Sequence, residues 1–298
     1  MTRAILTCWH KYQPYGGEYY EPLLDFYIGQ MKKFEDEYDQ IYFLDSTWNI
    51  DAARLEGLKA TIIKVDQSTR YYDVYKEVLP QVKEDLVLLM DDDMVVYKPG
   101  LIGASFELLK PNPVDGESYD VVSIYDTIGT YQTNQLNGKN KLCPYWFATR
   151  KDLLMQYRDI DWAPHMPHSE TLGLLTEAML KDGVKCFEFE EDKSNYLFGE
   201  GGTKGRENFG KDLGYYHIRA GSTPAYLMAE NKYGNPDTYR KYLDEQPRSE
   251  YLRQLAWYWY MCAFILTTDV VEVLEDASVD VGEFMDYLEE FATYHGLT

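Results

Sequence analysis

Short apolar runs alternate with segments of helical periodicity along the first third of the chain. Each run is bounded by polar or turn-forming residues, as expected for strands buried in a sheet. Between the runs, apolar residues recur at the spacing of amphipathic helices. The expected strands are 4–9, 40–44, 60–65 and 86–90, and the expected helices are 22–34, 52–58 and 71–82. These repeated units predict an α/β fold with a mostly parallel, doubly wound sheet flanked by helices, in which the strand tips face one side.

The pattern continues less regularly through the middle of the chain, where turns rich in proline and glycine separate the segments. The elements expected there are helices 101–109 and 171–181 and strands 120–125, 142–149 and 184–189. Residues 198–210 contain too many glycines for regular structure and predict a mobile loop. Beyond residue 230 the sequence is acidic and helical in pattern. We therefore expect a main domain at 1–230 and a C-terminal helical extension at 231–298.

The strand expected at 86–90 ends in three consecutive carboxylates, Asp91, Asp92 and Asp93. Open α/β sheets bind ligands at the carboxyl ends of their strands. Because side chains alternate along an extended chain, Asp91 and Asp93 would point to one side and Asp92 to the other. Two like charges so close are unfavourable unless a cation lies between them, and hard divalent cations prefer oxygen ligands. We expect Asp91 and Asp93 to bind a divalent metal, with a solvated turn as the alternative.

Composition narrows the classes of partner. The chain has 298 residues, with 29 Lys and Arg against 50 Asp and Glu and a formal net charge of −21. Such a charge repels polyanions, so non-specific nucleic-acid binding is not expected. Four scattered cysteines without a paired spacing are typical of reduced thiols and predict a cytoplasmic protein. We expect no secretion signal, and the longest uncharged apolar stretch, 255–266, is too short for a transmembrane segment.

The acidic strand end, the apolar residues 94–96 after it, a helix and a later histidine resemble the GT-A glycosyltransferases. The Asp-x-Asp motif formed by Asp91 and Asp93 is the hallmark that carries this resemblance. In that family the motif holds Mn²⁺ or Mg²⁺ against the diphosphate of a nucleotide-sugar, such as a UDP- or GDP-sugar. The resemblance therefore implies a metal-dependent glycosyltransferase that moves a hexosyl or pentosyl group to an unknown hydroxyl acceptor.

Further residues take their expected roles from the same resemblance. The segment 215–217, Tyr-Tyr-His, is similar to the late histidine that completes the metal site in many members, so His217 is the third expected ligand. Asp92 is an expected contact to the donor, through its sugar or ribose, and a possible metal contact. Glu170 is similar to the catalytic base of inverting members. The resemblance covers roughly residues 4 to 225.

Contacts to the nucleotide are expected from position in the fold. Thr7 and Trp9 lie at the tip of the first expected strand, and Asp45 lies at the tip of the second. Hydrogen-bonding and stacking groups at these tips would cradle the base and the ribose. Arg70, just before the helix expected at 71–82, is a further candidate contact, and a surface arginine is an equally good interpretation.

Several of these assignments have a purely structural alternative. Lys204 and Arg206 lie in the glycine-rich loop. If this loop closes as a lid, the two cations would cover the diphosphate. The alternative is that the loop is only a connector. His217 is either a metal ligand or a histidine satisfied within a sheet edge. Glu170 is either the base or a carboxylate favoured by the dipole at a helix N-terminus, with Ser169 as the cap.

Three other functions compete with glycosyl transfer. The run Asp91-Asp92-Asp93-Met94-Val95 also fits the Asp-x-Asp-x-Val pattern of the haloacid dehalogenase-like phosphohydrolases, in which Asp91 would be the nucleophile. That family usually places this strand first, whereas three strand and helix units precede it here. A sugar nucleotidyltransferase would need a glycine-rich loop after the first strand, where residues 9–15 contain no glycine. A non-catalytic module would bind the sugar or nucleotide without turnover.

Overall fold

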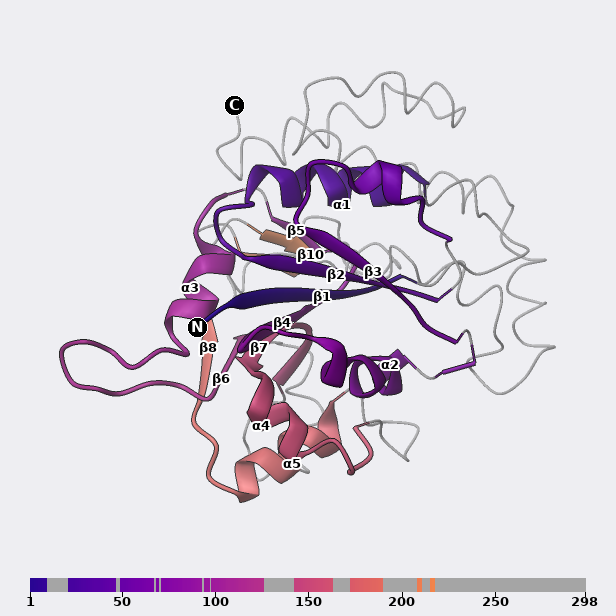
Figure 1. Ribbon diagram of the computed structural model, residues 1–298. Helices are drawn as coiled ribbons and strands as arrows, with labels where there is room; N and C mark the ends of the chain where they lie inside the picture. The colour runs from indigo at the N-terminus through magenta and orange to yellow at the C-terminus, as the bar shows by residue number, and fades with distance from the viewer. Residues whose placement is uncertain are drawn as a thin grey trace, which may run out of the picture. The chain divides into compact units, whose positions relative to one another are not determined.

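The protein is described by a computed structural model over residues 1–9, 21–46, 49–66, 68–69, 71–92, 94–96, 98–125, 142–162, 172–189, 208–210 and 215–217 (Figure 1). The chain divides into two compact units. The first comprises Met1–His10, Phe34–Asp92 and Lys98–Lys193, and the second comprises Lys11–Lys33, Asp93–Tyr97 and Ser194–Thr298. The chain thus passes from the first unit to the second within the acidic triplet. The expected boundary near residue 230 and the helical extension 231–298 lie outside the described residues.

The first unit contains a seven-stranded sheet with the order β3-β2-β1-β4-β7-β6-β8. Its strands are β1 (Arg3–Trp9), β2 (Gln40–Asp45), β3 (Ala60–Lys64), β4 (Leu86–Met90), β6 (Val121–Tyr125), β7 (Leu142–Arg150) and β8 (Cys186–Phe189). The first four strands run parallel, β7 runs antiparallel to β4 and β6, and β6 runs parallel to β8 (Figure 1). All five residues of β4 are buried, as expected for a strand covered on both faces.

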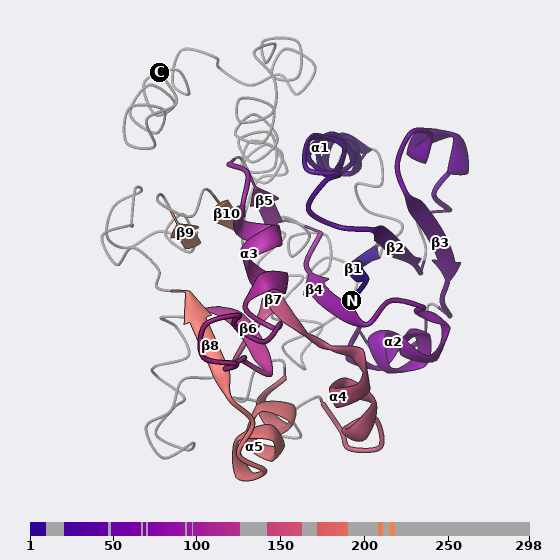
Figure 2. The ribbon, with the colours of Figure 1, turned by 60° about the vertical axis from the view of Figure 1, so that its left-hand side comes forward.

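Helices cover both faces of this sheet. One face carries α2 (Tyr71–Val78), α4 (Lys151–Gln156) and α5 (Gly173–Lys181), and the other carries α3 (Leu101–Glu107) (Figure 2). Side chains alternate between the two faces along a strand. On β1, Leu6 and Cys8 therefore both lie in the core beneath α2, α4 and α5. On the opposite face, Trp146 Nε1 donates to Ser105 Oγ of α3 at 3.0 Å. The mostly parallel sheet between helices confirms the predicted α/β fold class.

The second unit contains α1 (Glu21–Lys33) and a three-stranded sheet with the order β5-β10-β9. The strands are β5 (Met94–Val96), β9 (Asn208–Gly210) and β10 (Tyr215–His217), and both pairings are antiparallel. The expectation of a loop throughout 198–210 was wrong at its end, because Asn208–Gly210 pairs with β10. His217 lies on the central strand of this sheet, so its backbone is not at a sheet edge.

Two predicted helices differ from the structure. Segment 52–58 forms only a 3₁₀ turn, η2 (Ala52–Leu55), because Glu56 leaves the helical conformation with a ψ of 132°. Gly57 then takes a left-handed φ of 85°. A second 3₁₀ turn, η3 (Leu79–Gln81), follows α2. The helix expected from residue 171 begins at Gly173, after Leu172 with a φ of 60°. The N-cap of α5 is Leu172, and the alternative of Ser169 as a helix cap lies outside the described residues.

Candidate functional site

The carboxyl ends of β1, β2, β3 and β4 meet at one edge of the large sheet, because these strands are parallel and adjacent. Trp9 stands opposite Asp45 in the register of β1 and β2, and Asp45 stands opposite Lys64 in the register of β2 and β3. Asp91 and Asp92 follow β4 directly. The fold thus brings four of the sequence-predicted residues, together with Thr7, to this edge, which we call the carboxyl edge.

Asp45 has several bonding partners at the carboxyl edge. Its side chain is 1% exposed, and its two carboxylate oxygens accept hydrogen bonds from the backbone N–H of Asn49 at 3.2 Å and of Ile50 at 2.7 Å. Lys64 Nζ, on a half-exposed side chain, forms a close ion pair with the same carboxylate. Asp45 therefore ties the segment after β2 to the sheet, while Lys64 balances its charge.

Asp91 and Asp92 are half-buried at the end of β4, and the backbone N–H of Asp91 donates to Tyr145 O at 3.2 Å. Both carboxylates interact electrostatically with Cys8, a buried free thiol on β1. Burial is the largest cause that raises the pKa of Cys8 well above its usual value, and the carboxylates of Asp92, Asp91 and Asp45 raise it further. Burial and these carboxylates together keep Cys8 a neutral thiol at physiological pH.

Thr7 and Trp9 place polar atoms below this edge on the face opposite Cys8. The side chain of Thr7 is fully buried, and its hydroxyl has no hydrogen-bond partner among the described residues. Trp9 is also fully buried, and its ring packs against Phe43 with 6.3 Å between centroids. A buried hydroxyl without a partner is costly in a folded protein, and a bound ligand or water is the usual explanation. Among the predicted nucleotide contacts, Thr7 thus combines full burial with a hydroxyl that could bond a ligand.

The second unit holds the backbone around the other two predicted metal ligands. His217 is the register partner of Met94, and Met94 directly follows Asp93 in the sequence. Asp93 itself and the side chain of His217 lie outside what the structure describes. Within the described part of the chain, no three His, Cys, Asp or Glu side chains are grouped to hold a metal ion. The chemistry of the predicted set nevertheless suits Mn²⁺ or Mg²⁺, because carboxylate oxygens, with or without one imidazole, are ordinary ligands for these ions.

Other predicted residues fall on segments that the structure does not describe. They are Glu170, Arg70, Lys204 and Arg206, and their roles remain predictions. Sequence reasoning missed Lys64 at the carboxyl edge. The parallel register was the signal for Lys64, since the last residue of β3 must lie beside the last residue of β2.

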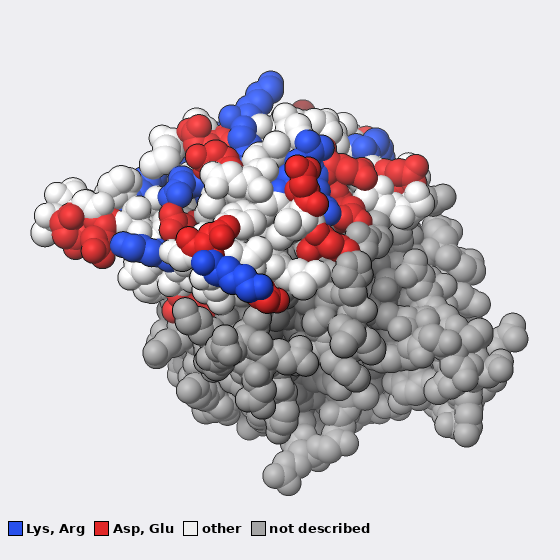
Figure 3. All heavy atoms as spheres, turned by 90° about the horizontal axis from the view of Figure 1, so that it is seen from below, with Lys and Arg blue, Asp and Glu red and all other residues white. Residues whose placement is uncertain are grey.

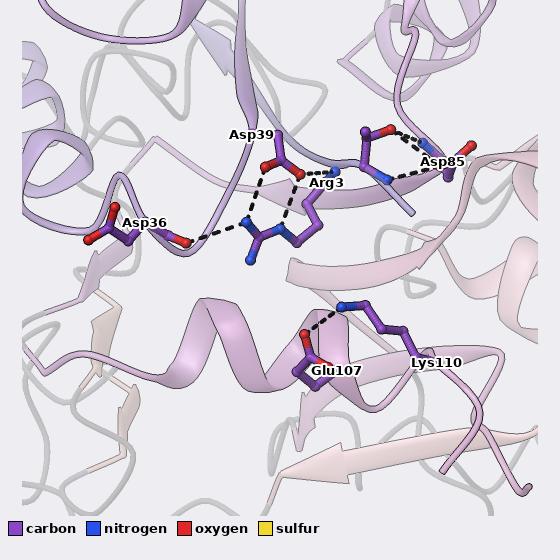
Figure 4. Close-up of polar contacts among 7 residues, drawn as sticks. Arg3, Asp36, Asp39, Asp85, Glu107 and Lys110 are labelled. Carbon is purple, nitrogen blue, oxygen red and sulfur yellow. Dashed lines mark hydrogen bonds and ion pairs between the residues drawn. The ribbon is translucent and has the colours of Figure 1, made fainter. Parts of the chain in front are cut away.

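The opposite edge of the sheet is built from matched charges (Figure 4). Arg3 forms a two-pronged ion pair with Asp39, with its guanidinium nitrogens at 3.1 and 3.2 Å from the two carboxylate oxygens. Asp85 accepts hydrogen bonds from the backbone N–H of Thr2 at 2.9 Å and from its hydroxyl at 3.3 Å. Arg150 pairs with Asp120 at 2.8 Å. We call this the amino edge, because β1, β2, β4 and β6 begin there.

The exposed surface of the described residues carries both signs of charge. Figure 3 shows one face on which acidic and basic side chains are interspersed. Helix pairs such as Lys76 with Asp73 at 2.8 Å and Lys181 with Glu177 at 2.6 Å contribute to this mixture. Among the described helices, none has both the length and the apolar composition that a membrane span requires.

Several solved structures resemble this protein in the course of the chain. Glucosyl-3-phosphoglycerate synthase from Mycobacterium tuberculosis, in complex with Mn²⁺, UDP-glucose and phosphoglyceric acid, is 14% identical, with 63% of this chain and 69% of that chain covered and a TM-score of 0.45. A CMP:2-keto-3-deoxy-manno-octonic acid synthetase bound to CTP is 15% identical, with 64% and 90% covered and a TM-score of 0.41. A protein from Desulfovibrio desulfuricans assigned as a nucleotide-diphospho-sugar transferase is 14% identical, with 64% and 80% covered and a TM-score of 0.41.

No protein-family model and no curated protein sequence matches the chain. At 14–15% identity and these TM-scores, the likeness to solved structures concerns the arrangement of the chain alone.

Proposed function

We propose that this protein is a divalent-metal-dependent glycosyltransferase that moves a sugar from a nucleoside-diphosphate-sugar to a hydroxyl acceptor. The observation that carries the proposal is the concentration of carboxylates at the carboxyl edge. Asp45, Asp91 and Asp92 all act electrostatically on one buried thiol, and the edge is where parallel α/β sheets bind nucleotides. A cation that bridges carboxylates to a diphosphate relieves this repulsion, which gives the arrangement a chemical purpose.

The metal ligands that we propose are Asp91, Asp93 and His217, with Asp92 in contact with the sugar or ribose of the donor. When bound, Mn²⁺ or Mg²⁺ would offset the negative charge that develops on the departing nucleoside diphosphate. A glutamate such as Glu170 would take the proton from the acceptor hydroxyl if the reaction inverts the sugar configuration. If the reaction retains the configuration, no such base is required.

The remaining proposed contacts hold the donor. The Thr7 hydroxyl would hydrogen-bond the nucleotide, and Trp9 and Arg70 would help to enclose the base and ribose. Asp45 is already bound by two backbone N–H groups and Lys64, so we assign it mainly to holding the segment after β2 in place. Lys204 and Arg206 would add positive charge over the diphosphate.

Release of nucleoside diphosphate tests the proposal. The protein is incubated with a panel of UDP- and GDP-sugars, with Mn²⁺ or with a chelator, and the diphosphate is measured. We expect release for at least one donor that requires the metal and disappears in Asp93→Ala. Phosphate release from simple phosphomonoesters by way of a trapped Asp91 phosphate would instead indicate a phosphohydrolase. Pyrophosphate release from a nucleoside triphosphate and a sugar would indicate a nucleotidyltransferase.

A further inference from the structure

One buried side chain in α1 forms two hydrogen bonds with the backbone of the segment that follows the acidic triplet. Gln30 is 1% exposed. Its Nε2 donates to Met94 O at 2.7 Å, and its Oε1 accepts from the backbone N–H of Val96 at 2.8 Å. Both hydrogen bonds are short and buried. Gln30 is thus attached to the backbone at two points of β5.

The two bonds lie on the edge of β5 that faces away from β10. Residues two apart on a strand direct their backbone polar groups to the same edge, so Met94 and Val96 present the carbonyl and the N–H together. Figure 2 shows β5 beside β10, and β5 is the outer strand of the order β5-β10-β9. Gln30 therefore supplies the donor and the acceptor that a fourth strand would otherwise supply.

This attachment fixes the chain directly after Asp93. On one side β5 is held by Gln30, and on the other it is paired with β10, with His217 opposite Met94. Met94 and Val96 are each 1% exposed, so water cannot replace the side-chain amide without opening the packing. The side-chain amide of Gln30 thereby holds β5, which directly follows Asp93 and pairs with the strand that carries His217.

We propose that Gln30 is a positioning residue for the metal site, acting through the backbone of β5 on Asp93 and, through the strand pairing, on His217. The inference rests on the proposed function. The chemistry is specific to an amide, because it must donate and accept at the same time. Glutamate would set a carboxylate oxygen against the carbonyl of Met94, and methionine would leave both backbone groups without a partner in a buried place.

Binding of Mn²⁺ without any donor sugar tests the proposal, with free Mn²⁺ measured by electron paramagnetic resonance. We expect Gln30→Met to weaken Mn²⁺ binding by roughly 10- to 100-fold, the usual effect of losing a residue that orients metal ligands. The same variant should raise the Mn²⁺ concentration needed for half-maximal diphosphate release. Gln30→Glu keeps the bond from Val96 and loses the bond to Met94, so it should also weaken binding.

Ser105→Ala is the matched control. Ser105 is fully buried, donates from Oγ to Leu101 O at 2.9 Å and accepts from Trp146 at 3.0 Å, so its loss also breaks two buried hydrogen bonds. It lies in the first unit, on α3, and should lower the melting temperature without changing Mn²⁺ affinity.

The outcomes separate the two proposals. Absence of Mn²⁺ binding in the wild-type protein would overturn the metal-dependent function itself. Tight binding in the wild type together with unchanged binding in folded Gln30→Met would overturn only the role of Gln30. If Gln30→Met does not fold, Gln30→Glu decides, because unchanged Mn²⁺ affinity in that variant has the same meaning.

Discussion

The amino and carboxyl edges of the large sheet treat negative charge in opposite ways. At the amino edge, hydrogen bonds from Arg3 hold the pKa of Asp39 below its usual value, and the N–H of Thr2 does the same for Asp85. At the carboxyl edge, carboxylates instead add to the effect of burial and raise the pKa of the Cys8 thiol. At the amino edge these carboxylates are stabilised by a guanidinium or an N–H group, whereas at the carboxyl edge several carboxylates act on one thiol.

Asp120 extends the comparison along the amino edge. Its partial burial works against ionisation, but the N–H of Lys185 and the guanidinium of Arg150 outweigh that effect and lower its pKa. Each amino-edge carboxylate thus has a partner supplied by the fold. At the carboxyl edge, by contrast, several carboxylates act on one buried thiol, and we infer that a cation and a diphosphate suit this concentration of negative charge.

The largest predicted effect compares the two ends of β4. Asp91→Asn, at the carboxyl edge, should lower metal-dependent diphosphate release by about 1,000-fold or more, because metal stabilisation of a leaving group is worth several kcal/mol. Asp85→Asn, at the amino edge, should leave the rate nearly unchanged. Both variants are assayed at saturating Mn²⁺ with circular dichroism to confirm folding. Equal losses in the two variants would remove the functional distinction between the edges.

The next effect concerns the ion pair between the buried Asp45 and the half-exposed Lys64. Lys64→Met should lower the free energy of unfolding by about 2 kcal/mol, because a buried carboxylate loses its cation while keeping two N–H bonds. Lys181→Met removes an exposed pair with Glu177 and should cost less than about 0.5 kcal/mol. Urea unfolding of both variants measures the difference. A Lys64→Met cost no larger than that of Lys181→Met would show that Asp45 does not depend on its cation.

Two buried threonines should respond with opposite signs. The hydroxyl of Thr149, toward the amino edge, donates to Asp120 O at 2.7 Å, so Thr149→Val should destabilise the fold by about 1 kcal/mol. Thr7 has no described partner, so Thr7→Val should stabilise the fold by about 1 kcal/mol while raising the KM for the donor. Chemical unfolding and donor titration test both readouts. Destabilisation by Thr7→Val would show that its hydroxyl is satisfied within the folded protein.

The smallest effect is the pH dependence of the amino edge. Because the pKa of Asp39 is lowered by folding, its contribution is fully present above the unfolded pKa of about 3.9 and is lost as the pH falls through the lower folded pKa. Asp39→Asn should therefore flatten the fall in stability between about pH 4 and pH 2, by less than about 1 kcal/mol for this partly exposed pair. Unfolding at pH 7 and pH 3 measures it, and an unchanged pH slope would contradict it.

The strands were predictable because a buried parallel strand must be apolar along its whole length, as β4 is. Helix starts were less predictable, since Leu172 enters a left-handed conformation before α5 that apolar spacing does not encode. The antiparallel direction of β7 was equally invisible, because periodicity is the same in both directions. The strand Asn208–Gly210 was missed because tertiary pairing with β10 overrides a sequence rich in glycine.

The candidate site was predictable where sequence position fixes it and not where distant chain segments meet. Thr7, Asp45, Asp91 and Asp92 follow from strand ends, so their common edge could be foreseen. The contact of Gln30 with Met94 and Val96 joins residues 64 and 66 positions apart, and no periodicity links them. The sequence offered one signal, a glutamine within an amphipathic helix. If its side-chain amide is buried, it needs both a hydrogen-bond donor and an acceptor nearby.

A crystal soaked with Mn²⁺ and a nucleotide-sugar tests the central claim most directly. The account predicts one anomalous scattering peak beside the Asp91–Asp93 carboxylates, with the donor diphosphate as a further ligand of the same ion. Donor density without a peak at these carboxylates, or a peak that persists unchanged in Asp91→Asn and Asp93→Asn crystals, would contradict it.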